Sequence, residues 1–211
     1  QIVVIDHHRK MVNHIDNAVV FFHEPFASSA CEMATELIQY FGGDCKVSIS
    51  EAEALLAGIM LDTKNFVMRS NARTFEAAAY LKKLGADTIV VKSFFSDSLE
   101  TYREKSVLIQ SAKIFHGCAI AVTESTAQEL RLAAPQAADE LLGISGVKAS
   151  FVIYRMDGIS YISARSMGAF NVQLIMETVG GGGHQTMAGA QLDVSLAEAE
   201  AKVKDAIEDF L

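Results

Sequence analysis

The sequence is poor in several residue types, and each shortage excludes a class of protein. Tryptophan is absent and only 2 of the 211 residues are proline, which favours a helix-rich or mixed α/β fold. The three cysteines, Cys31, Cys45 and Cys118, include no C-x-x-C pair. Neither a disulfide framework nor a structural zinc site is expected, and a reducing cytosol fits best. We expect these cysteines to act as small apolar residues in or near the core.

Long apolar runs and excess positive charge are missing as well. No stretch of 18 or more apolar residues occurs, so we expect no contact of this segment with a membrane. The formal net charge is −8, which argues against a broad basic face for duplex nucleic acid. An anionic substrate would need local positive charge, from metal ions or from a few placed arginines and lysines.

Half of the residues are hydrophobic, enough to bury a sizeable core, and their pattern predicts two lobes. The first lobe extends to residue 95. Ile2–Ile5, Val19–Phe22 and Thr88–Val91 are expected to be short strands in it. Capping boxes or apolar faces predict helices over 29–41, from Ser50 to Asp62, and over 73–84.

The second lobe mixes strands and helices. The charged stretch 99–114 predicts a helix, which we interpret as the connector between lobes. Apolar runs predict strands over 119–122, 149–155 and 159–165, the last two joined by a hairpin turn at Asp157-Gly158. Thr126–Leu142, with a capping box at its start, predicts a helix, and further helices are expected over 171–178 and from Ser195.

The first group of candidate functional residues is Asp6-His7-His8, at the end of the first predicted strand. Imidazole and carboxylate are ligands for ions such as Mn²⁺ or Zn²⁺. Neighbouring side chains of a strand point in opposite directions, so one histidine would face a metal while the other faces substrate. Asp6 would fix a ring tautomer by accepting an imidazole N–H. A polar turn with a partly exposed histidine pair is the alternative.

Asp62 follows an apolar helix and is the second candidate. A carboxylate at this point is suited to bind a metal, but a polar residue at a helix end serves equally as a cap. Lys64, Arg69 and Arg73 follow closely. They are candidates to assist an anionic ligand, or simply surface charge.

The run Gly180–His184 is the third candidate. Four successive glycines cost backbone entropy, which is understandable where backbone N–H groups must closely approach phosphate oxygens. A flexible loop is the alternative. Arg165 and Ser166 come after a predicted strand, and the guanidinium of Arg165 is suited to bind phosphate, although a solvated strand end also explains them.

Together these pieces resemble the DHH–DHHA1 phosphoesterases. Asp6-His7-His8 matches the motif that names the family, and Leu61-Asp62-Thr63 matches the next motif downstream. Residues 163–166, Asn171 and Gly180–His184 match the DHHA1 substrate-binding lobe. The resemblance implies an α/β fold of two lobes: part of a DHH domain with a mostly parallel sheet (1–95), a helical connector (96–112) and a smaller mixed α/β DHHA1 domain (113–211).

The stretches 55–66, 73–78 and 84–87 most resemble the branch of bacterial phosphodiesterases that hydrolyses cyclic di-AMP to 5′-pApA. The resemblance implies two Mn²⁺ ions as cofactors, with His7 and Asp62 as metal ligands. His8, with Asp6, would be catalytic and face the substrate phosphate. The residues implied in holding the substrate phosphate and base are Arg165, Ser166, Gly181, Gly182, Gly183 and His184.

One departure from the family concerns the residues that precede the triplet. The family's catalytic lobe begins with a His-x-x-x-Asp-x-Asp motif and a further bridging Asp, none of which precedes Asp6 here. We therefore expect a fragment that retains only His7 and Asp62 of the metal shell, binds metal poorly and is nearly inactive alone. The resemblance implies that the longer protein to which such a fragment belongs lies at the cytoplasmic face of the bacterial membrane, where upstream helices anchor it.

Two alternatives stay open. Family members of the nano-RNase type degrade very short RNAs and dephosphorylate adenosine bisphosphate, so the substrate is a cyclic dinucleotide or a short oligonucleotide. The chain is also compatible with a nucleotide-binding or homodimerisation module that has no activity of its own.

Overall fold

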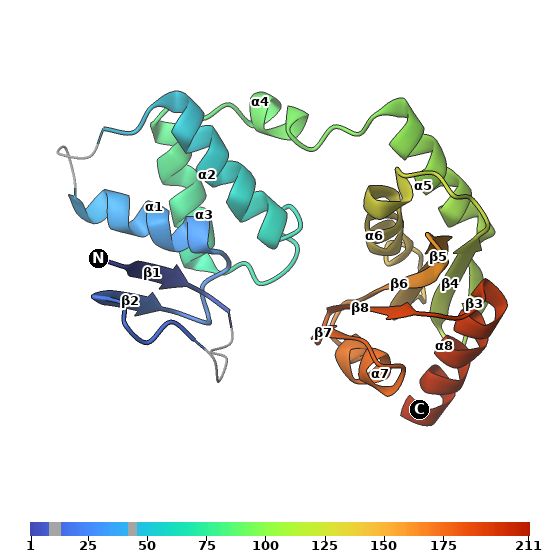
Figure 1. The fold of residues 1–211 in the computed structure, drawn as a ribbon. Helices are drawn as coiled ribbons and strands as arrows, with labels where there is room; N and C mark the ends of the chain where they lie inside the picture. Colours follow the sequence, from blue (N-terminus) through green and yellow to red (C-terminus); the bar gives the residue numbers. More distant parts are fainter. Residues whose placement is uncertain (9–13, 42–45) are drawn as a thin grey trace. The chain divides into compact units, whose positions relative to one another are not determined.

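The computed structural model describes residues 1–8, 14–41 and 46–211, and Figure 1 traces the chain from its N-terminus to its C-terminus. The chain divides into two compact units, 1–96 and 97–211. Cys118 is buried and burial raises the pKa of its thiol to about 11, which fits an apolar role, while Cys45 lies outside the described residues. Within the described ranges, no helix has the length and apolar character needed to cross a bilayer.

A parallel pair of strands opens the first unit. β1 (Val3–Asp6) runs beside β2 (Val20–His23), with Val3 opposite Val20 and Asp6 opposite His23. Figure 1 shows helices α1, α2 and α3 gathered on one side of this pair. The parallel pairing confirms the sheet type expected for the DHH part of the chain.

Helices α1 (Ala30–Phe41), α2 (Ile49–Asp62), α3 (Ala72–Lys83) and α4 (Thr88–Ser93) complete the first unit. Their shared core consists of small and branched apolar residues: Ala52, Leu56, Ile59, Ala77, Leu81, Ala86 and Val91. The capping box of α2 uses Ser48 and Glu51. It therefore begins two residues earlier than the box predicted from Ser50, because Ser48 has the extended backbone that an N-cap requires.

The predicted strand at Thr88–Val91 is wrong, since these residues form helix α4. The Asp87 carboxylate accepts the backbone N–H of Ile89 at 2.8 Å and so caps a helix. Val91 is fully buried in the core of the first unit. A local cap and one buried contact outweigh the strand preference of β-branched residues, which is weak and depends on context.

A six-stranded sheet forms the centre of the second unit. Its order is β3-β4-β5-β6-β8-β7. β4 and β5 are parallel, whereas the other neighbouring pairs are antiparallel, which confirms the mixed architecture. The strands are β3 (Lys113–Phe115), β4 (Cys118–Thr123), β5 (Ala149–Met156), β6 (Ile159–Ser166), β7 (Gly182–His184) and β8 (Met187–Leu192).

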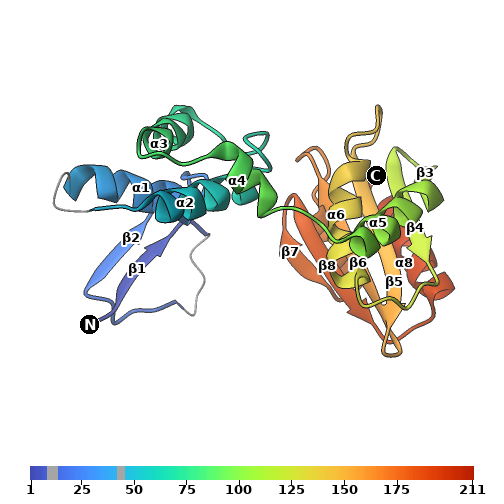
Figure 2. The same cartoon turned by 90° about the horizontal axis from the view of Figure 1, so that it is seen from above.

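Helices cover both faces of this sheet, as Figures 1 and 2 show. One face packs on α7 (Val172–Thr178) and α8 (Leu196–Phe210). The other packs mainly on α6 (Leu130–Leu141), with Leu108 of α5 (Leu99–Ser111) in the same core. β4 shows the strict alternation of a strand between two cores, because Ile120 faces the α7–α8 core and Ala121 the α6 core.

Two turns in the second unit test local predictions. The hairpin between β5 and β6 turns at Asp157 (φ 52°) and Gly158 (φ 85°), which confirms the prediction from the Asp-Gly pair. The capping box predicted at Thr126 is wrong, because α6 begins at Leu130 without a side-chain cap. The chain before it is turned instead by the hydroxyls of Thr123 and Ser125, which accept backbone N–H groups two residues on.

The predicted connector, 96–112, contains α5, which lies within the second unit. Lys105 fastens α5 to α6. Its ammonium lies 3.0 Å from Asp97 and 2.8 Å from Glu140, and Gln136 of α6 donates to the same Asp97 at 2.8 Å. The Lys105 side chain is only 9% exposed, so its charge needs these partners.

Replacement of Lys105 by Ala should therefore destabilise the second unit by about 1–3 kcal/mol, since Asp97 would be left half-buried without its cation. Urea unfolding monitored by circular dichroism measures the effect. Lys202→Ala, at an exposed position of α8, is the matched control and should change stability by less than about 0.5 kcal/mol. Equal losses in the two variants would contradict the assigned role of Lys105.

Candidate functional site

The triplet Asp6-His7-His8 lies at the carboxyl end of β1, whose last residue is Asp6. The two imidazole rings do not point in opposite directions as predicted, since their centroids lie 4.5 Å apart. The reason is that His7 and His8 follow the strand and are not subject to its alternation. His8 is 63% exposed, and its Nδ1 lies 2.8 Å from the Asp6 carboxylate. The same carboxylate accepts the backbone N–H of His8, which lowers the pKa of Asp6. Asp6 thus orients the His8 ring as expected: with Nδ1 carrying the proton, Nε2 is left as the acceptor nitrogen.

Whereas the neighbouring His8 is exposed, His7 is buried. Its side chain is 7% exposed, and Nε2 lies 3.6 Å from the Asp62 carboxylate at the end of α2. Its buried Nδ1 has no hydrogen-bond partner among the described residues, which is uncommon for a buried polar atom. The structure therefore brings together the two residues expected to bind metal, and the exposed ring of His8 lies next to that of His7.

A tight turn after α2 holds Asp62 in place. Residues 64–66 all have positive φ, at 49°, 56° and 66°, although none is glycine; each such residue costs on the order of 1–2 kcal/mol. The buried Thr63 hydroxyl compensates by donating to the Ile59 carbonyl at 2.7 Å and accepting from Phe66 N–H at 3.0 Å. Backbone strain of this kind is typical of functional sites, and no sequence signal predicted it.

The ligand types at this point suit a metal ion such as Mn²⁺, which accepts imidazole nitrogen and carboxylate oxygen. His7 and Asp62 supply one of each. Within the described ranges, no group of three or more His, Cys, Asp or Glu side chains is arranged to hold a metal. These residues thus fit part of a metal shell, and the remaining ligands would have to be water, substrate or other groups.

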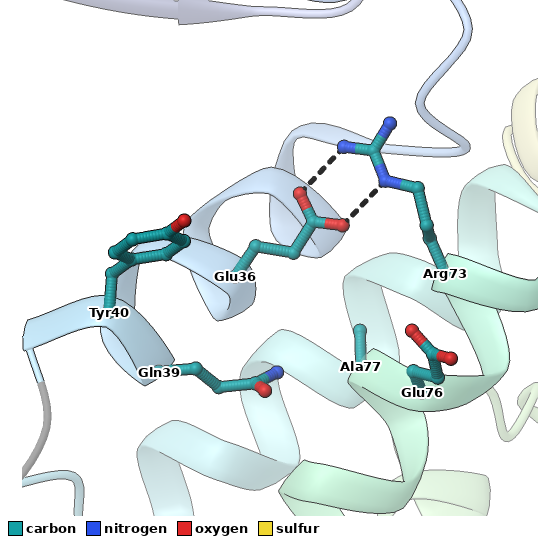
Figure 3. Close-up of a pocket in the computed structure, with 6 residues that line it drawn as sticks. All are labelled: Glu36, Gln39, Tyr40, Arg73, Glu76 and Ala77. Atoms are coloured by element: carbon teal, nitrogen blue, oxygen red, sulfur yellow. Dashed lines mark hydrogen bonds and ion pairs between the residues drawn. The ribbon is translucent and has the colours of Figure 1, made fainter.

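The arginine at the start of α3 is paired with a carboxylate of α1. Arg73 donates Nε and Nη2 to the two carboxylate oxygens of Glu36 at 2.8 and 2.7 Å, and this pairing raises the Arg73 pKa. Figure 3 shows the pair above a pocket of about 630 Å³ between α1 and α3. Glu76 also lines the pocket. Its negative charge would repel a phosphate group.

In the second unit the glycine run is built into the sheet. Gly182–His184 forms edge strand β7, antiparallel to β8. A Cβ on Gly181 would lie 2.3 Å from the Gly189 carbonyl oxygen, and one on Gly183 would lie 2.5 Å from Met187 O. A Cβ on Gly182 would meet nothing within 4 Å. Gly181 and Gly183 are thus required for packing, whereas Gly182 borders open space.

Register places two candidate residues of this unit, Arg165 and His184, on one face of the sheet. Arg165 of β6 lies opposite Met187 of β8, which lies opposite His184 of β7. Partners across antiparallel strands share a face, so Arg165 and His184 lie on the same face, the one that carries α6. The α6 helix packs on β5 and β6.

Arg165 itself is largely buried, with 11% of its side chain exposed. Burial lowers the pKa of its guanidinium, and Asp139 of α6, 3.2 Å from Nε, counteracts this. Nη1 donates to the Ala164 carbonyl at 2.9 Å. Asp139 is thus a positioning residue for Arg165 that the sequence did not reveal, because an acidic residue on a helix is usually solvated surface.

The Ser166 hydroxyl makes its hydrogen bonds within the loop that follows β6. Its hydroxyl is buried and donates to the Phe170 carbonyl at 2.6 Å, and it accepts the Gly168 N–H at 3.3 Å. The Gly181 N–H is likewise used, donated to Met176 O at 2.8 Å. These contacts hold the loop after β6 and the start of the glycine run, and substrate contact by Ser166 stays a prediction.

The glycine geometry predicts opposite outcomes for neighbouring substitutions. Gly181→Ala should destabilise the second unit by about 1–3 kcal/mol, because its Cβ would collide with the backbone of β8. Gly182→Ala is the matched control and should remain within about 0.5 kcal/mol of the parent. Urea unfolding measures the effect, and equal stabilities for the two variants would refute the assigned close approach.

Comparison with known proteins places this geometry in a family. Residues 1–59 match the model of the DHH family N-terminal domain, and residues 119–211 match that of the DHHA1 domain. An exopolyphosphatase-related protein from Bacteroides fragilis has the same fold, with a TM-score of 0.86 at 22% identity, over 99% of this chain and 63% of that one.

Curated relatives align over nearly the whole sequence. The cyclic-di-AMP phosphodiesterase GdpP of Geobacillus thermodenitrificans is 49% identical over 99% of this chain, and PdeA of Listeria monocytogenes, of the same description, is 47% identical over 99%. The chain spans about a third of their length, 32% in each case. With a DHH segment followed by a DHHA1 domain, the chain belongs to the DHH–DHHA1 family.

Proposed function

We propose that this chain is part of a metal-dependent phosphodiesterase that hydrolyses cyclic di-AMP to 5′-pApA. The observation that carries the proposal is 47–49% identity, over 99% of the chain, to two proteins described as cyclic-di-AMP phosphodiesterases. The described residues are compatible with this reaction: the first unit offers metal ligands and an oriented histidine, and the second offers candidate phosphate-binding groups. We further propose, from the resemblance, that the protein works at the cytoplasmic face of a bacterial membrane.

In the first unit we assign the metal-binding role to His7 and Asp62, and the metal to Mn²⁺. Bound Mn²⁺ would supply Lewis-acid activation of water and would neutralise charge on the phosphoryl group. His7 suits the role because Nε2 of its buried imidazole lies 3.6 Å from the Asp62 carboxylate, a distance at which one ion can contact both groups. Exposed His8, oriented by Asp6, would face the phosphate and stabilise its developing charge by hydrogen bonding when protonated.

In the second unit we assign substrate binding to Arg165, the glycine run and His184. β7 is an edge strand of the described sheet, so it keeps backbone groups that pair with no further strand, and such edges can bind anions. The open space at Gly182 allows a ligand to approach the backbone there. Gly181 and Gly183 contribute by permitting the close packing of β7 on β8.

The metal assignment predicts weak Mn²⁺ binding by the 211-residue chain, because one imidazole and one carboxylate fall short of the six ligands that Mn²⁺ commonly takes. Water-proton relaxation during Mn²⁺ titration measures it. His7→Ala and Asp62→Asn should each weaken binding at least about tenfold. Glu76→Gln, in the acidic pocket of Figure 3, controls for non-specific attraction. Two tightly bound ions per chain would refute the expected incomplete site.

A second candidate is degradation of short RNA and dephosphorylation of adenosine bisphosphate. It is favoured by 26% identity, over the full chain, to the bifunctional oligoribonuclease and PAP phosphatase NrnA of Thermus thermophilus. The first candidate is preferred because the identity to the cyclic-di-AMP phosphodiesterases is nearly twice as high.

A substrate comparison separates the two candidates. The protein as its gene encodes it is incubated with Mn²⁺ and, separately, cyclic di-AMP, pApA or adenosine 3′,5′-bisphosphate, and products are resolved chromatographically. We expect cyclic di-AMP to be consumed fastest, with pApA as product, and His8→Ala to lower kcat by about 10²-fold or more. Faster loss of pApA or the bisphosphate would favour the second candidate. Binding without turnover would indicate a nucleotide-binding module.

A further inference from the structure

A pocket of about 380 Å³ lies on the second unit's sheet, next to the glycine run. It belongs to the face that carries α6, where β6 and β8 extend beyond the part of the sheet covered by that helix. Its lining combines two aromatic rings, two polar side chains, one isoleucine and four residues with little or no side chain: Tyr154, Tyr161, Ser163, Gln191, Ile162, Gly180, Gly181, Gly189 and Ala190.

The aromatic wall of the pocket is rigid. Tyr154 and Tyr161 are cross-strand partners on β5 and β6, with ring centroids 5.3 Å apart and an interplanar angle of 14°. Tyr154 is only 5% exposed and packs into the core under α6, and burial raises its pKa. Because Tyr154 supports one side of Tyr161, the half-exposed ring of Tyr161 is held in place without an ordering cost on binding.

The floor of the pocket is flat because its residues have little or no side chain. Gly189 of β8 lies opposite Ser163, two pairs along the strands from the Tyr161–Gln191 pair and therefore on the same face. A Cβ on Gly189 would lie 2.7 Å from the Ile162 carbonyl oxygen, so the strands pair closely only with glycine there. Together with Gly180 and Gly181, this leaves a shallow surface beside a ring, a shape that suits a planar ligand.

The polar groups at the margin are available for a ligand. Gln191 is the cross-strand neighbour of Tyr161 on β8 and is exposed. Neither its amide nor the Ser163 hydroxyl takes part in a hydrogen bond within the described ranges. A carboxamide offers one donor and one acceptor side by side, which matches N7 and N6–H₂ of adenine. Guanine presents two acceptors, O6 and N7, at the same edge and would satisfy only the donor.

We propose that this pocket binds one nucleobase of the substrate, with adenine stacked on Tyr161 and read by Gln191. The assignment rests on the proposed function and adds the base subsite to the phosphate-binding groups of the neighbouring glycine run. Stacking on an aromatic side chain is a general mode of binding unpaired bases, and hydrogen bonds to the base edge confer selectivity.

Calorimetry on the 211-residue chain tests the proposal with three probes: AMP, GMP and ribose 5-phosphate, which has the phosphate but no base. AMP should bind on the order of tenfold more tightly than ribose 5-phosphate, as expected for one stacked base. Tyr161→Leu should abolish this difference, whereas Tyr161→Phe, which retains the ring, should keep it. Tyr102→Leu, on exposed α5 surface, is the matched control and should leave all three affinities unchanged.

Selectivity is tested at Gln191. Gln191→Met removes the amide at similar length, so AMP should lose its preference over GMP while both still bind more tightly than ribose 5-phosphate. Circular dichroism and urea unfolding establish that each variant is folded. If Tyr161→Leu does not fold, the affinities of the unsubstituted chain for AMP and ribose 5-phosphate still show whether a base is bound.

The outcomes separate this proposal from the one on which it rests. Equal affinities for AMP and ribose 5-phosphate would overturn the base pocket and leave phosphate binding by the second unit intact. A base-dependent affinity unaffected by Tyr161→Leu would also overturn it. Failure of the chain to bind any probe would overturn the base pocket together with the substrate-binding role of this unit. Base-dependent binding alongside no hydrolysis of cyclic di-AMP would support the pocket and count against the proposed reaction.

Discussion

The close approach of β7 to β8 is the constraint on which the candidate substrate site depends. It requires glycine at 181 and 183, because any Cβ there would overlap the backbone or side chains of β8. Once the two strands are paired, register alone places Arg165, His184 and the open backbone at Gly182 on one face of the sheet. The glycine run is thus a strand whose composition is set by packing, and its openness to a ligand follows from its position at the sheet edge.

Helix α6 covers part of this face of the sheet and also supplies a side chain to the candidate site. α6 packs on β5 and β6 with a row of alanines and leucines, and it contributes Asp139 to hold the buried guanidinium of Arg165. Where α6 ends its cover, the stacked tyrosines and the small residues of β8 form a pocket. The candidate phosphate-binding groups and an aromatic wall therefore lie on one face of the same unit.

In the first unit, two neighbouring histidines have separate environments. His7 is buried against Asp62 and has an unsatisfied nitrogen, whereas His8 is exposed and oriented by Asp6. The alternation of a strand's side chains did not predict this arrangement, because β1 ends at Asp6 and the two rings lie 4.5 Å apart. The three left-handed residues that follow Asp62 were not predictable, because lysine, asparagine and phenylalanine carry no strong signal for positive φ and are held there by a buried threonine.

The sequence by itself determined the family, the two-part organisation, the Asp-Gly hairpin and the identity of most candidate residues, because these depend on local motifs and short-range chemistry. It misjudged Thr88–Val91, where one capping carboxylate and burial of Val91 outweigh β-propensity. Only the tertiary structure decided which residues meet: Asp62 with His7, Asp139 with Arg165, and Tyr154 with Tyr161. Such contacts join residues distant in the chain, and strand register and helix packing set them.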